Sequence, residues 1–348
     1  MEYCSLGGDG DLTVSAIGYG CQSIGGGIHH SDDATAIRAL QHALNCGITF
    51  FDTADHYSLG HSERLVGQAF AGNRDAVVIA TKVGTRYTRV GEAALRLRST
   101  LRPARRWLGR FKPLLNQWRA GQRAYDYSEE YLQHAVNASL RRLCTDRIDL
   151  LQLHKPPAHV LRQGTFVPAI ERLQAEGKVR CVGIACDSEE DTMLAMEIPG
   201  IVAIQLTLNL LQPENDALAR SAAAKGCPVI ARNPLAQGYL AGDARTLLGE
   251  EYAADRSAAR KLEQQAQLFS FLECPGRTRV QAALLYARAL PGVRIVLPRL
   301  LAVEQVNEVA SAPEAIPLSA EELCTIEEIR NERLTPIRRY DYRAGRGV

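Results

Sequence analysis

Short apolar runs recur along the chain, and several of them follow a helical stretch that ends in glycine. The pattern occurs in ALNCGITFFDT, LQAEGKVRCVGIA, AAAKGCPVIARNP and ALPGVRIVLP. Glycine after the last helical turn supplies the positive φ angle that ends a helix, and the β-branched, apolar run behind it is typical of a parallel strand buried on both faces. This alternation predicts βα units joined by right-handed crossovers.

Eight apolar runs have the length and composition of strands. The predicted strands are AIGYG (16–20), ITFFD (48–52), AVVIATK (76–82), IDLLQLH (148–154), VRCVGIA (179–185), IVAIQL (201–206), PVIARN (228–233) and RIVLP (294–298). Helical patterns lie between them, at 32–46, 128–143, 166–177, 214–226 and 278–290. Eight alternating units fit a closed (β/α)8 TIM barrel of the α/β class. A doubly wound sheet would require GxGxxG after the first strand, and GCQSIGGG does not match it.

The 348 residues are long enough for one barrel or for two ordinary domains. We predict a single barrel domain over residues 1–348, with an N-terminal β-hairpin. At the other end, SAEELCTIEEIRNERL predicts a C-terminal helix that starts with a capping box.

Two segments interrupt the repeating pattern. The first is an insertion after the third strand, at about 86–127, with eleven Lys and Arg residues against Glu92 and Asp126. Because the whole chain has a net charge of only +2, the rest of it is acidic. The second is a loop segment at about 243–277, which could form a second wall of a cleft on the same face.

The basic insertion has three interpretations. Its Trp107, Phe111 and Trp118 could pack as a lid over the barrel mouth while its arginines select an anionic substrate. It could instead dock an acidic protein or a membrane surface. The third interpretation is a solvated loop with no role in specificity.

Four polar residues lie at or just past the ends of predicted strands: Asp52, Tyr57, Lys82 and His154. Chemistry in such barrels occurs at the carboxyl-terminal face, where we expect these side chains to meet. Lys82 would lower the pKa of Tyr57 and pair with Asp52, and His154 would hydrogen-bond a carbonyl. Taken singly, each has an ordinary structural explanation, such as a turn residue or a satisfied histidine. Together they predict a site that protonates an oxygen while a cofactor supplies hydride.

Composition restricts the possible partners. The nine cysteines include no CxxC, and the first residues contain no apolar segment of signal-peptide length, so we predict a cytoplasmic protein. No apolar run is long enough to span a bilayer, and the small net charge does not indicate nucleic acid. No metal is predicted, and the oligomeric state is left open.

The chain resembles the aldo-keto reductase family over nearly its whole length. The likeness is carried by VSAIGYGCQSIGG, FFDTADHYSLGHSERLVGQAF, VIATKVG, SLRRLCTDRIDLLQLHKP, LQAEGKVRCVGIA, ARNPLAQGYLAG and VLPRLLAVEQVNE. The resemblance implies a (β/α)8 barrel and an NADPH-dependent carbonyl reductase. It also implies a catalytic tetrad of Asp52, Tyr57, Lys82 and His154, with Tyr57 as the general acid.

The resemblance implies NADP as the cofactor, with NAD possible. The implied cofactor-binding residues are Gly20, Cys21, Gln22, Asp52, Cys186, Gln205, Arg232, Asn233, Pro234, Leu235, Gln237, Gly238, Pro298, Arg299 and Gln305.

Several positions depart from the family pattern. Ala185 and Cys186 stand where the family usually has Ser-Asn, and Arg232 stands where an aromatic residue usually stacks on the nicotinamide. Arg232 could contact a pyrophosphate or a substrate anion, or it could be an ordinary salt-bridge residue. Arg299 replaces a glycine, and Leu301 replaces the arginine that engages the adenosine 2'-phosphate.

We therefore predict an oxidoreductase that reduces an aldehyde or ketone to an alcohol, or catalyses the reverse reaction, on a small anionic or sugar-like molecule. Two alternatives remain. A non-redox lyase, dehydratase or isomerase could use the same four residues, and a cofactor-sensing regulatory protein could bind a partner through the basic insertion.

Overall fold

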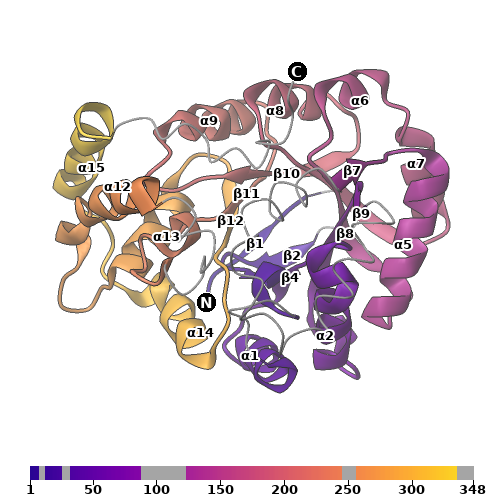
Figure 1. The fold of residues 1–348 in the computed structure, drawn as a ribbon, viewed down its shortest axis with the longest axis horizontal. Coiled ribbons are helices and arrows are strands. Elements are labelled where there is room, and N and C mark those ends of the chain that lie inside the picture. The colour runs from indigo at the N-terminus through magenta and orange to yellow at the C-terminus, as the bar shows by residue number, and fades with distance from the viewer. Residues whose placement is uncertain (8–11, 26–31, 88–122, 245–255, 335–348) are drawn as a thin grey trace, which may run out of the picture.

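A barrel of eight parallel strands forms the centre of the molecule (Figure 1). The computed structural model describes residues 1–7, 12–25, 32–87, 123–244 and 256–334. In sheet order the strands are β3 (Tyr19–Gly20), β4 (Phe50–Asp52), β5 (Val78–Val83), β8 (Ile148–His154), β9 (Val179–Ala185), β10 (Ile201–Thr207), β11 (Val229–Arg232) and β12 (Val293–Leu297). Every strand predicted from the sequence is confirmed.

The first and last strands close the barrel through backbone hydrogen bonds. The amide of Gly18 donates to the carbonyl of Val296, and the amide of Gly20 donates to that of Pro298, both at 2.9 Å. A Cβ atom at Gly20 would lie 2.9 Å from the same Pro298 oxygen, so this close approach requires glycine.

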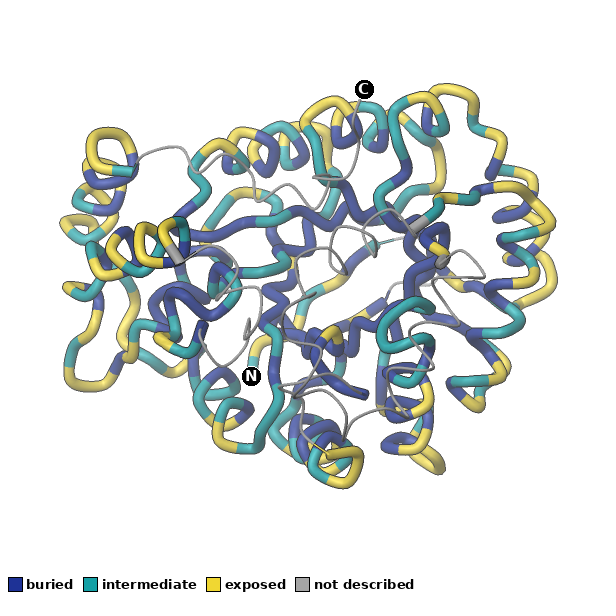
Figure 2. The backbone as a smooth tube through the Cα atoms, viewed as in Figure 1, coloured by how far each residue is buried: buried dark blue, intermediate teal, exposed yellow. Residues whose placement is uncertain are grey.

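Side chains that point into the barrel form an apolar layer toward the amino-terminal ends of the strands. The strands contribute Phe50, Ala80, Leu150, Cys181, Ala203, Ile230 and Ile295. The predicted hairpin, β1 (Tyr3–Ser5) paired with β2 (Thr13–Ser15), is confirmed and adds Leu6, Leu12 and Val14 to this cluster. Figure 2 shows the strands as the most continuously buried part of the chain. The hairpin therefore packs against one end of the barrel and leaves the other end for the site.

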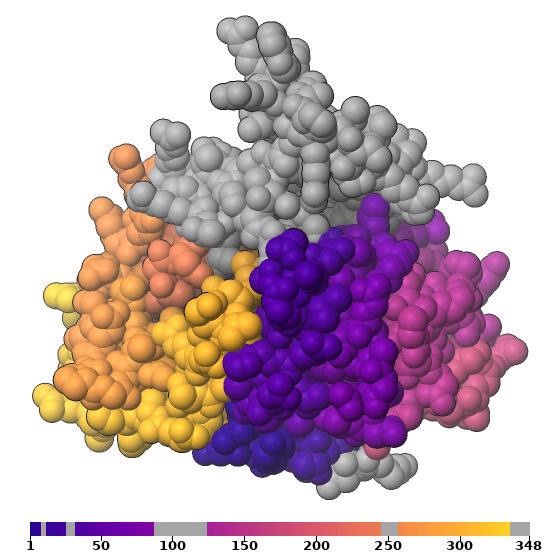
Figure 3. Space-filling model, turned by 90° about the horizontal axis from the view of Figure 1, so that it is seen from below, coloured from indigo at the N-terminus to yellow at the C-terminus, as the bar shows by residue number. Residues whose placement is uncertain are grey.

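A ring of helices surrounds the strands. It consists of α1 (Asp33–Asn45), α2 (His61–Ala69), α5 (Glu129–Leu143), α7 (Val167–Ala175), α8 (Glu189–Ala195), α9 (Asp216–Ala224), α13 (Arg279–Ala289) and α14 (Val303–Ala310). The glycines of the repeated sequence pattern, Gly47, Gly177, Gly226 and Gly292, all have positive φ, as predicted. Helices α1 and α14 are in contact, so the first and last helices of the ring are neighbours (Figure 3).

Three helices lie outside the simple alternation: α6 (Ala158–Gln163), α12 (Arg256–Gln267) and α15 (Ala320–Glu332). The C-terminal helix α15 begins with the predicted capping box, in which Ser319 and Glu322 bond each other's backbone amides. Arg330 of α15 bonds Asp216 of α9, at 2.6 Å, and the Tyr286 hydroxyl of α13. These three polar side chains are buried and fix α15 to the ring.

The segment 243–277 is not simply a loop, because it contains α12. Its amphipathic sequence places Ala266 against a second apolar cluster, with Phe269, Leu272, Tyr239 and Leu240 nearby. The prediction of a loop over this segment was therefore wrong for Arg256–Gln267.

The basic insertion begins and ends in a short antiparallel ribbon, β6 (Thr85–Tyr87) paired with β7 (Arg123–Tyr125). Residues 88–122 lie outside the described part of the chain, so its three interpretations remain predictions. Residues 335–348 also lie outside the described part of the chain. Among the described helices, none has the length and apolar character needed to cross a membrane. The nine cysteines are all free thiols.

Candidate active site

The predicted residues Asp52 and Lys82 form a buried ion pair inside the barrel. In β4, β5, β8 and β10, a polar residue follows two positions after the residue of the apolar layer. Side chains two positions apart on a strand point to the same side, so these polar side chains also point into the barrel. The Lys82 ammonium donates to Asp52 Oδ2 and to the Thr53 carbonyl, the latter at 3.0 Å. The amides of Gln152 and Gln205 donate to Asp52 Oδ1 at 2.7 and 3.3 Å. The carboxylate is therefore satisfied on both oxygens.

The buried pair determines the charge of Lys82. Burial alone would lower its pKa, but the neighbouring Asp52 carboxylate and the Tyr57 hydroxyl outweigh burial and raise the pKa above its usual value. Lys82 is 1% exposed and Asp52 is 3% exposed, so solvent screens this attraction little. The ammonium is a fixed positive charge at neutral pH.

Tyr57 lies in a 3₁₀ turn, Tyr57–Gly60, that follows β4. Ser58 and Leu59 have left-handed φ angles of 50° and 56°, a strained conformation of the kind found at functional sites. The Lys82 ammonium lies 5.3 Å from the centre of the Tyr57 ring. The Tyr57 hydroxyl makes no hydrogen bond to the described part of the chain.

The pKa of Tyr57 is higher than that of an ordinary tyrosine. Burial raises this pKa, and its effect is larger than that of any neighbouring charge. Lys82 acts in the predicted direction and lowers this pKa, as do Arg232 and Arg299, whereas Asp52 raises it. The expectation that Lys82 would bring the net pKa down was therefore wrong, because desolvation of the phenolate outweighs the nearby cation. Tyr57 is fully protonated at neutral pH.

His154 ends β8 beside the same turn. Its ring centre lies 6.3 Å from that of Tyr57 and 4.6 Å from that of His56. Burial, together with His56 and nearby cations, lowers the pKa of His154 well below its usual value, so the imidazole is neutral. The Tyr127 hydroxyl donates to the His154 carbonyl at 2.8 Å. The structure thus brings together all four residues predicted to act on an oxygen atom.

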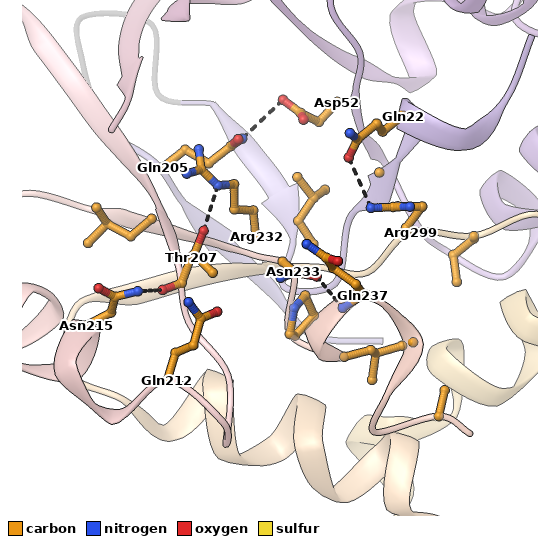
Figure 4. A pocket seen from close by; sticks show the side chains of 18 of the residues that line it. Gln22, Asp52, Gln205, Thr207, Gln212, Asn215, Arg232, Asn233, Gln237 and Arg299 are labelled. Atoms are coloured by element: carbon orange, nitrogen blue, oxygen red, sulfur yellow. Dashed lines mark hydrogen bonds between the residues drawn. The ribbon is translucent and has the colours of Figure 1, made fainter. Parts of the chain in front are cut away.

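A cavity of about 550 Å³ opens beside this group, and of the four residues Asp52 and Tyr57 line it. It extends from Asp52 and Tyr57 in the barrel to Val280 on α13 and to Glu308 on α14. Figure 4 shows its polar wall, to which separate strands and loops contribute. Its lining includes most of the predicted cofactor-binding residues: Gly20, Gln22, Asp52, Cys186, Gln205, Arg232, Asn233, Pro234, Leu235, Gln237, Gly238, Arg299 and Gln305.

Cys21 and Pro298, which were also predicted to bind the cofactor, do not line this cavity. Cys21 is fully buried, and its thiol donates to the Tyr19 carbonyl at 3.6 Å. Pro298 is buried at the seam of the barrel, where its carbonyl accepts the closing bond from Gly20.

Comparison with known proteins agrees with this geometry. The sequence profile described as "Aldo/keto reductase family" matches residues 16–331. The chain belongs to the aldo/keto reductase family. An uncharacterized oxidoreductase of Bacillus subtilis (strain 168), YqkF, is 27% identical over 318 residues, which cover 91% of this chain and 92% of that protein. These findings confirm the resemblance inferred from the motifs.

Two solved structures of this family have the same fold. Aldo-keto reductase AKR11C1 from Bacillus halodurans, in its holo form, has a TM-score of 0.73 and 28% identity, covering 94% of this chain and 96% of that one. An aldo/keto reductase from Klebsiella pneumoniae, in complex with NADP and acetate, has a TM-score of 0.67 and 26% identity, covering 92% and 93%. The (β/α)8 barrel is confirmed.

Arg232 differs from the family pattern, and the structure shows how it is held. Its Nε donates to Thr207 Oγ1 at 3.0 Å (Figure 4), and its Nη2 donates to the Cys186 carbonyl and to Asp187 Oδ1 at 2.9 and 2.5 Å. Lys155 pairs with the other Asp187 oxygen at 2.7 Å. Burial opposes ionisation of Asp187, but these two cations lower its pKa to about 2. Arg232 therefore forms a salt bridge, as one of its interpretations expected, but it does so in the cavity wall, at 18% side-chain exposure.

Cys186 lines the cavity in this aldo/keto reductase where the resemblance implies asparagine. Burial raises the pKa of its thiol to about 12, so it presents a neutral, weakly polar group. The expected side-chain clamp is therefore absent at Ala185 and Cys186, while Gln205 remains in place.

The part of the cavity next to α14 is also polar. The Arg299 guanidinium donates to Gln22 Oε1 at 3.3 Å. Gln305 accepts from the Leu301 amide at 2.8 Å and donates to Asp243 Oδ2 at 3.4 Å. Of these, Leu301 does not line the cavity, whereas Asp243 does.

Sequence reasoning missed several residues behind the tetrad. Gln152 had a usable signal, because it is a polar residue inside a fully buried strand. Tyr131 donates to Asp55 Oδ2 at 3.4 Å, and burial raises the pKa of Asp55 to about 7 although Arg142 opposes this. Tyr127 and Tyr131 had no signal, since either could have been an ordinary half-buried aromatic. Within the described ranges, no group of His, Cys, Asp and Glu residues has the arrangement of a metal site.

Proposed function

We propose that this chain reduces an aldehyde or ketone to the alcohol, or catalyses the reverse oxidation, with a nicotinamide dinucleotide and with Tyr57 as the group that donates or accepts the proton. The observation that carries the proposal is the position of Tyr57. Its ring lines the cavity, its hydroxyl makes no hydrogen bond to the described residues, and Lys82 lies 5.3 Å from the ring centre.

The cavity is compatible with a dinucleotide. It extends from the tetrad to the outer helices, and its wall offers the polar side chains that such a ligand requires, including Gln205, Arg232 and Arg299. One buried oxygen on the wall, Asp243 Oδ1, has no hydrogen-bond partner in the described residues, as expected where a ligand supplies the donor. The NADP found in the Klebsiella pneumoniae relative supports the same class of cofactor. A bound reduced nicotinamide supplies the hydride.

The residues of the chain would handle the proton. Tyr57 is protonated at neutral pH and donates to the carbonyl oxygen as negative charge develops there. The Lys82 ammonium stabilises the phenolate that remains, and Asp52 fixes the position of that ammonium. Neutral His154 donates a hydrogen bond that orients the substrate oxygen. The reverse reaction uses the same groups with Tyr57 as base.

For the substrate, we propose a small anionic or sugar-like carbonyl compound. The wall near Tyr57 carries Lys155, Asp187 and Arg232, with more basic than acidic groups. The hydroxyls of a sugar or one carboxylate could bond to such a surface.

The proposal is tested by following the absorbance of NADH and NADPH with a panel of aldehydes, ketones and sugars, and by the reverse assay with the corresponding alcohols. Turnover on at least one carbonyl or alcohol is expected. If a cofactor binds but no member of the panel reacts in either direction, the oxidoreductase proposal fails. That result would favour a lyase, an isomerase or a cofactor sensor.

A further inference from the structure

The outer end of the cavity carries a half-buried carboxylate, Asp243, that the proposed proton chemistry does not use. Asp243 follows the loop after β11 and bonds Gln305 of α14 at 3.4 Å. The inner end of the cavity lies inside the barrel at Asp52, whereas α14 belongs to the outer ring and contacts α1 and α13. Asp243 therefore lies toward the outside of the ring and not at the reacting centre.

One oxygen of Asp243 lacks a partner. Gln305 donates to Oδ2, but Oδ1 is buried and accepts no hydrogen bond from any described residue. Burial is also the main cause of the raised pKa of this carboxyl. A buried acceptor without a partner costs free energy, so this oxygen is suited to a ligand that carries a hydrogen-bond donor.

The charges around Asp243 do not favour a phosphate. Glu308 of α14 also lines the cavity and raises the pKa of Asp243, and its own carboxylate accepts from Thr278 Oγ1 at 2.7 Å. Among the described residues, Arg299 is the cation that lowers that pKa, and it bonds Gln22. Leu301, whose amide bonds Gln305, contributes no charge. Two carboxylates therefore line this end of the cavity, and among the described residues Arg299 is the cation that acts on Asp243.

A dinucleotide is an extended molecule, so the position of one end in the cavity determines where the other end lies. Its nicotinamide must lie beside Tyr57 for the proposed reaction, so its adenosine must lie toward α14. NADH has a ribose 2'-hydroxyl there, which can donate a hydrogen bond, and acidic side chains are the usual partners of that hydroxyl. NADPH has a 2'-phosphate, which carries negative charge and is a strong acceptor, and it usually meets an arginine.

We propose that Asp243 accepts a hydrogen bond from the adenosine ribose of NADH and is a specificity-determining residue that makes this chain bind NADH in preference to NADPH. This inference rests on the proposed function, because the orientation of the cofactor is set by Tyr57. Glu308 adds a second repulsive charge against the 2'-phosphate. Arg299 lines the same cavity and acts electrostatically on both Tyr57 and Asp243, so it can face the pyrophosphate that both cofactors share.

Binding, and not turnover, tests the inference. Dissociation constants of NADH and NADPH are measured by isothermal titration calorimetry on the full chain at pH 8 without substrate. NADH is expected to bind about tenfold more tightly than NADPH, a difference that corresponds to about 1.4 kcal/mol. Asp243→Asn, which removes the charge at constant size, is expected to tighten NADPH binding and reduce the ratio to about threefold or less.

Asp146→Asn is the matched control. It makes the same change in net charge at a carboxylate that is 88% exposed at the start of β8, remote from the cavity. It should leave the ratio of the two dissociation constants unchanged. Leu301→Arg adds a cation beside Gln305 and should tighten NADPH binding without strengthening NADH binding. This second variant tests the inference if Asp243→Asn folds poorly.

Four results would overturn the inference. NADPH binding as tightly as NADH to the unaltered chain removes the preference itself. A preference that survives Asp243→Asn in a folded protein removes the role of Asp243, and an equal change with Asp146→Asn assigns the effect to overall charge. Binding of neither cofactor at millimolar concentration removes the proposed function as well, and so differs from a failure of the preference alone.

Discussion

At the scale of single residues, Tyr57 combines a protonated hydroxyl on the cavity wall with an ammonium group beside its ring. Burial keeps the proton on the phenol, and Lys82 stabilises the charge left when the proton moves. These opposing effects suit an acid that must lose its proton only in the transition state. Asp52 contributes indirectly, because it holds Lys82 in place.

Replacing Tyr57 by phenylalanine should remove the proton donor and leave the ring in place. We expect kcat to fall by about 10²- to 10⁴-fold, the usual contribution of a positioned acid, with little change in cofactor binding. Initial rates and calorimetric titration with the cofactor measure the two quantities. Tyr3→Phe, which removes a hydroxyl from the amino-terminal hairpin, is the control and should be silent. Retained turnover in Tyr57→Phe would refute the acid role.

Asp55 gives a prediction about stability and pH. Burial raises its pKa to about 7 in the folded protein, above the value of about 3.9 in an unfolded chain. Its stabilising contribution is therefore present below the unfolded pKa and is lost as the pH rises through 7. Lys82, His56, Tyr131 and Arg142 are the polar groups that face it.

Asp55→Asn removes this titration and keeps an acceptor for Tyr131. As the pH rises from 5 to 8, the unaltered protein should lose unfolding free energy through Asp55 and the variant should not. We expect the stability of the variant relative to the unaltered protein to increase by up to about 2 kcal/mol over this range. Urea unfolding at the two pH values measures the difference. An equal effect at both values would show that Asp55 does not titrate in this range.

At the scale of elements, the β6–β7 ribbon links the basic insertion to the tetrad. Tyr127, two residues beyond β7, is buried and donates to the carbonyl of His154. Gly84, just before β6, has a φ of +112°, and a Cβ atom there would lie 2.2 Å from the Tyr127 ring. The base of the insertion is therefore packed directly against the strand that carries His154.

Tyr127→Phe should keep this packing and remove one hydrogen bond. The lost hydrogen bond contributes about 1 kcal/mol to holding His154 in position, so we expect kcat to fall about fivefold. KM should change little, because Tyr127 acts through His154 and does not line the cavity. Steady-state kinetics separate the two constants. Tyr125→Phe, on the exposed side of β7, is the matched control. A change confined to thermal stability would mean that Tyr127 has only a structural role.

Much of this arrangement followed from the sequence, because strand ends and helix ends carry local signals. Gly47 and Gly177 end helices with positive φ, and the polar residues after the strands must meet at one face of a barrel. The contacts of Tyr127 were not predictable in this way. They depend on packing between segments far apart in the chain, which no local pattern encodes. The pKa of Tyr57 was predicted in the wrong direction because desolvation is a property of the folded interior.

At the scale of the whole molecule, the C-terminal helix is joined to the ring by buried polar groups. Arg330 bonds Asp216 and Tyr286, and all three are less than a tenth exposed. Arg277, which lies just before α13, forms a second link to α15 by bonding Glu322. The helix is thus part of the cooperative structure, far from the tetrad.

Arg330→Met would leave the Asp216 carboxylate buried without its cation. We expect the free energy of unfolding to fall by about 3 kcal/mol, as is typical when one partner of a buried pair is removed. Urea unfolding followed by circular dichroism measures this loss. Arg333→Met, just past the end of α15, should be nearly neutral. An unchanged stability of Arg330→Met would show that α15 is held by its apolar contacts alone.

The closure of the barrel between Gly18 and Val296 also has a consequence for biosynthesis. These partners are separated by most of the chain, so β3 and its neighbours are made long before the strand that completes them. Until Val296 has left the ribosome, the nascent sheet has two unpaired edges of the kind that pair with other chains. Premature termination before β12 should therefore yield aggregation-prone fragments and not a smaller working barrel, and synthesis should depend on chaperones that shield those edges.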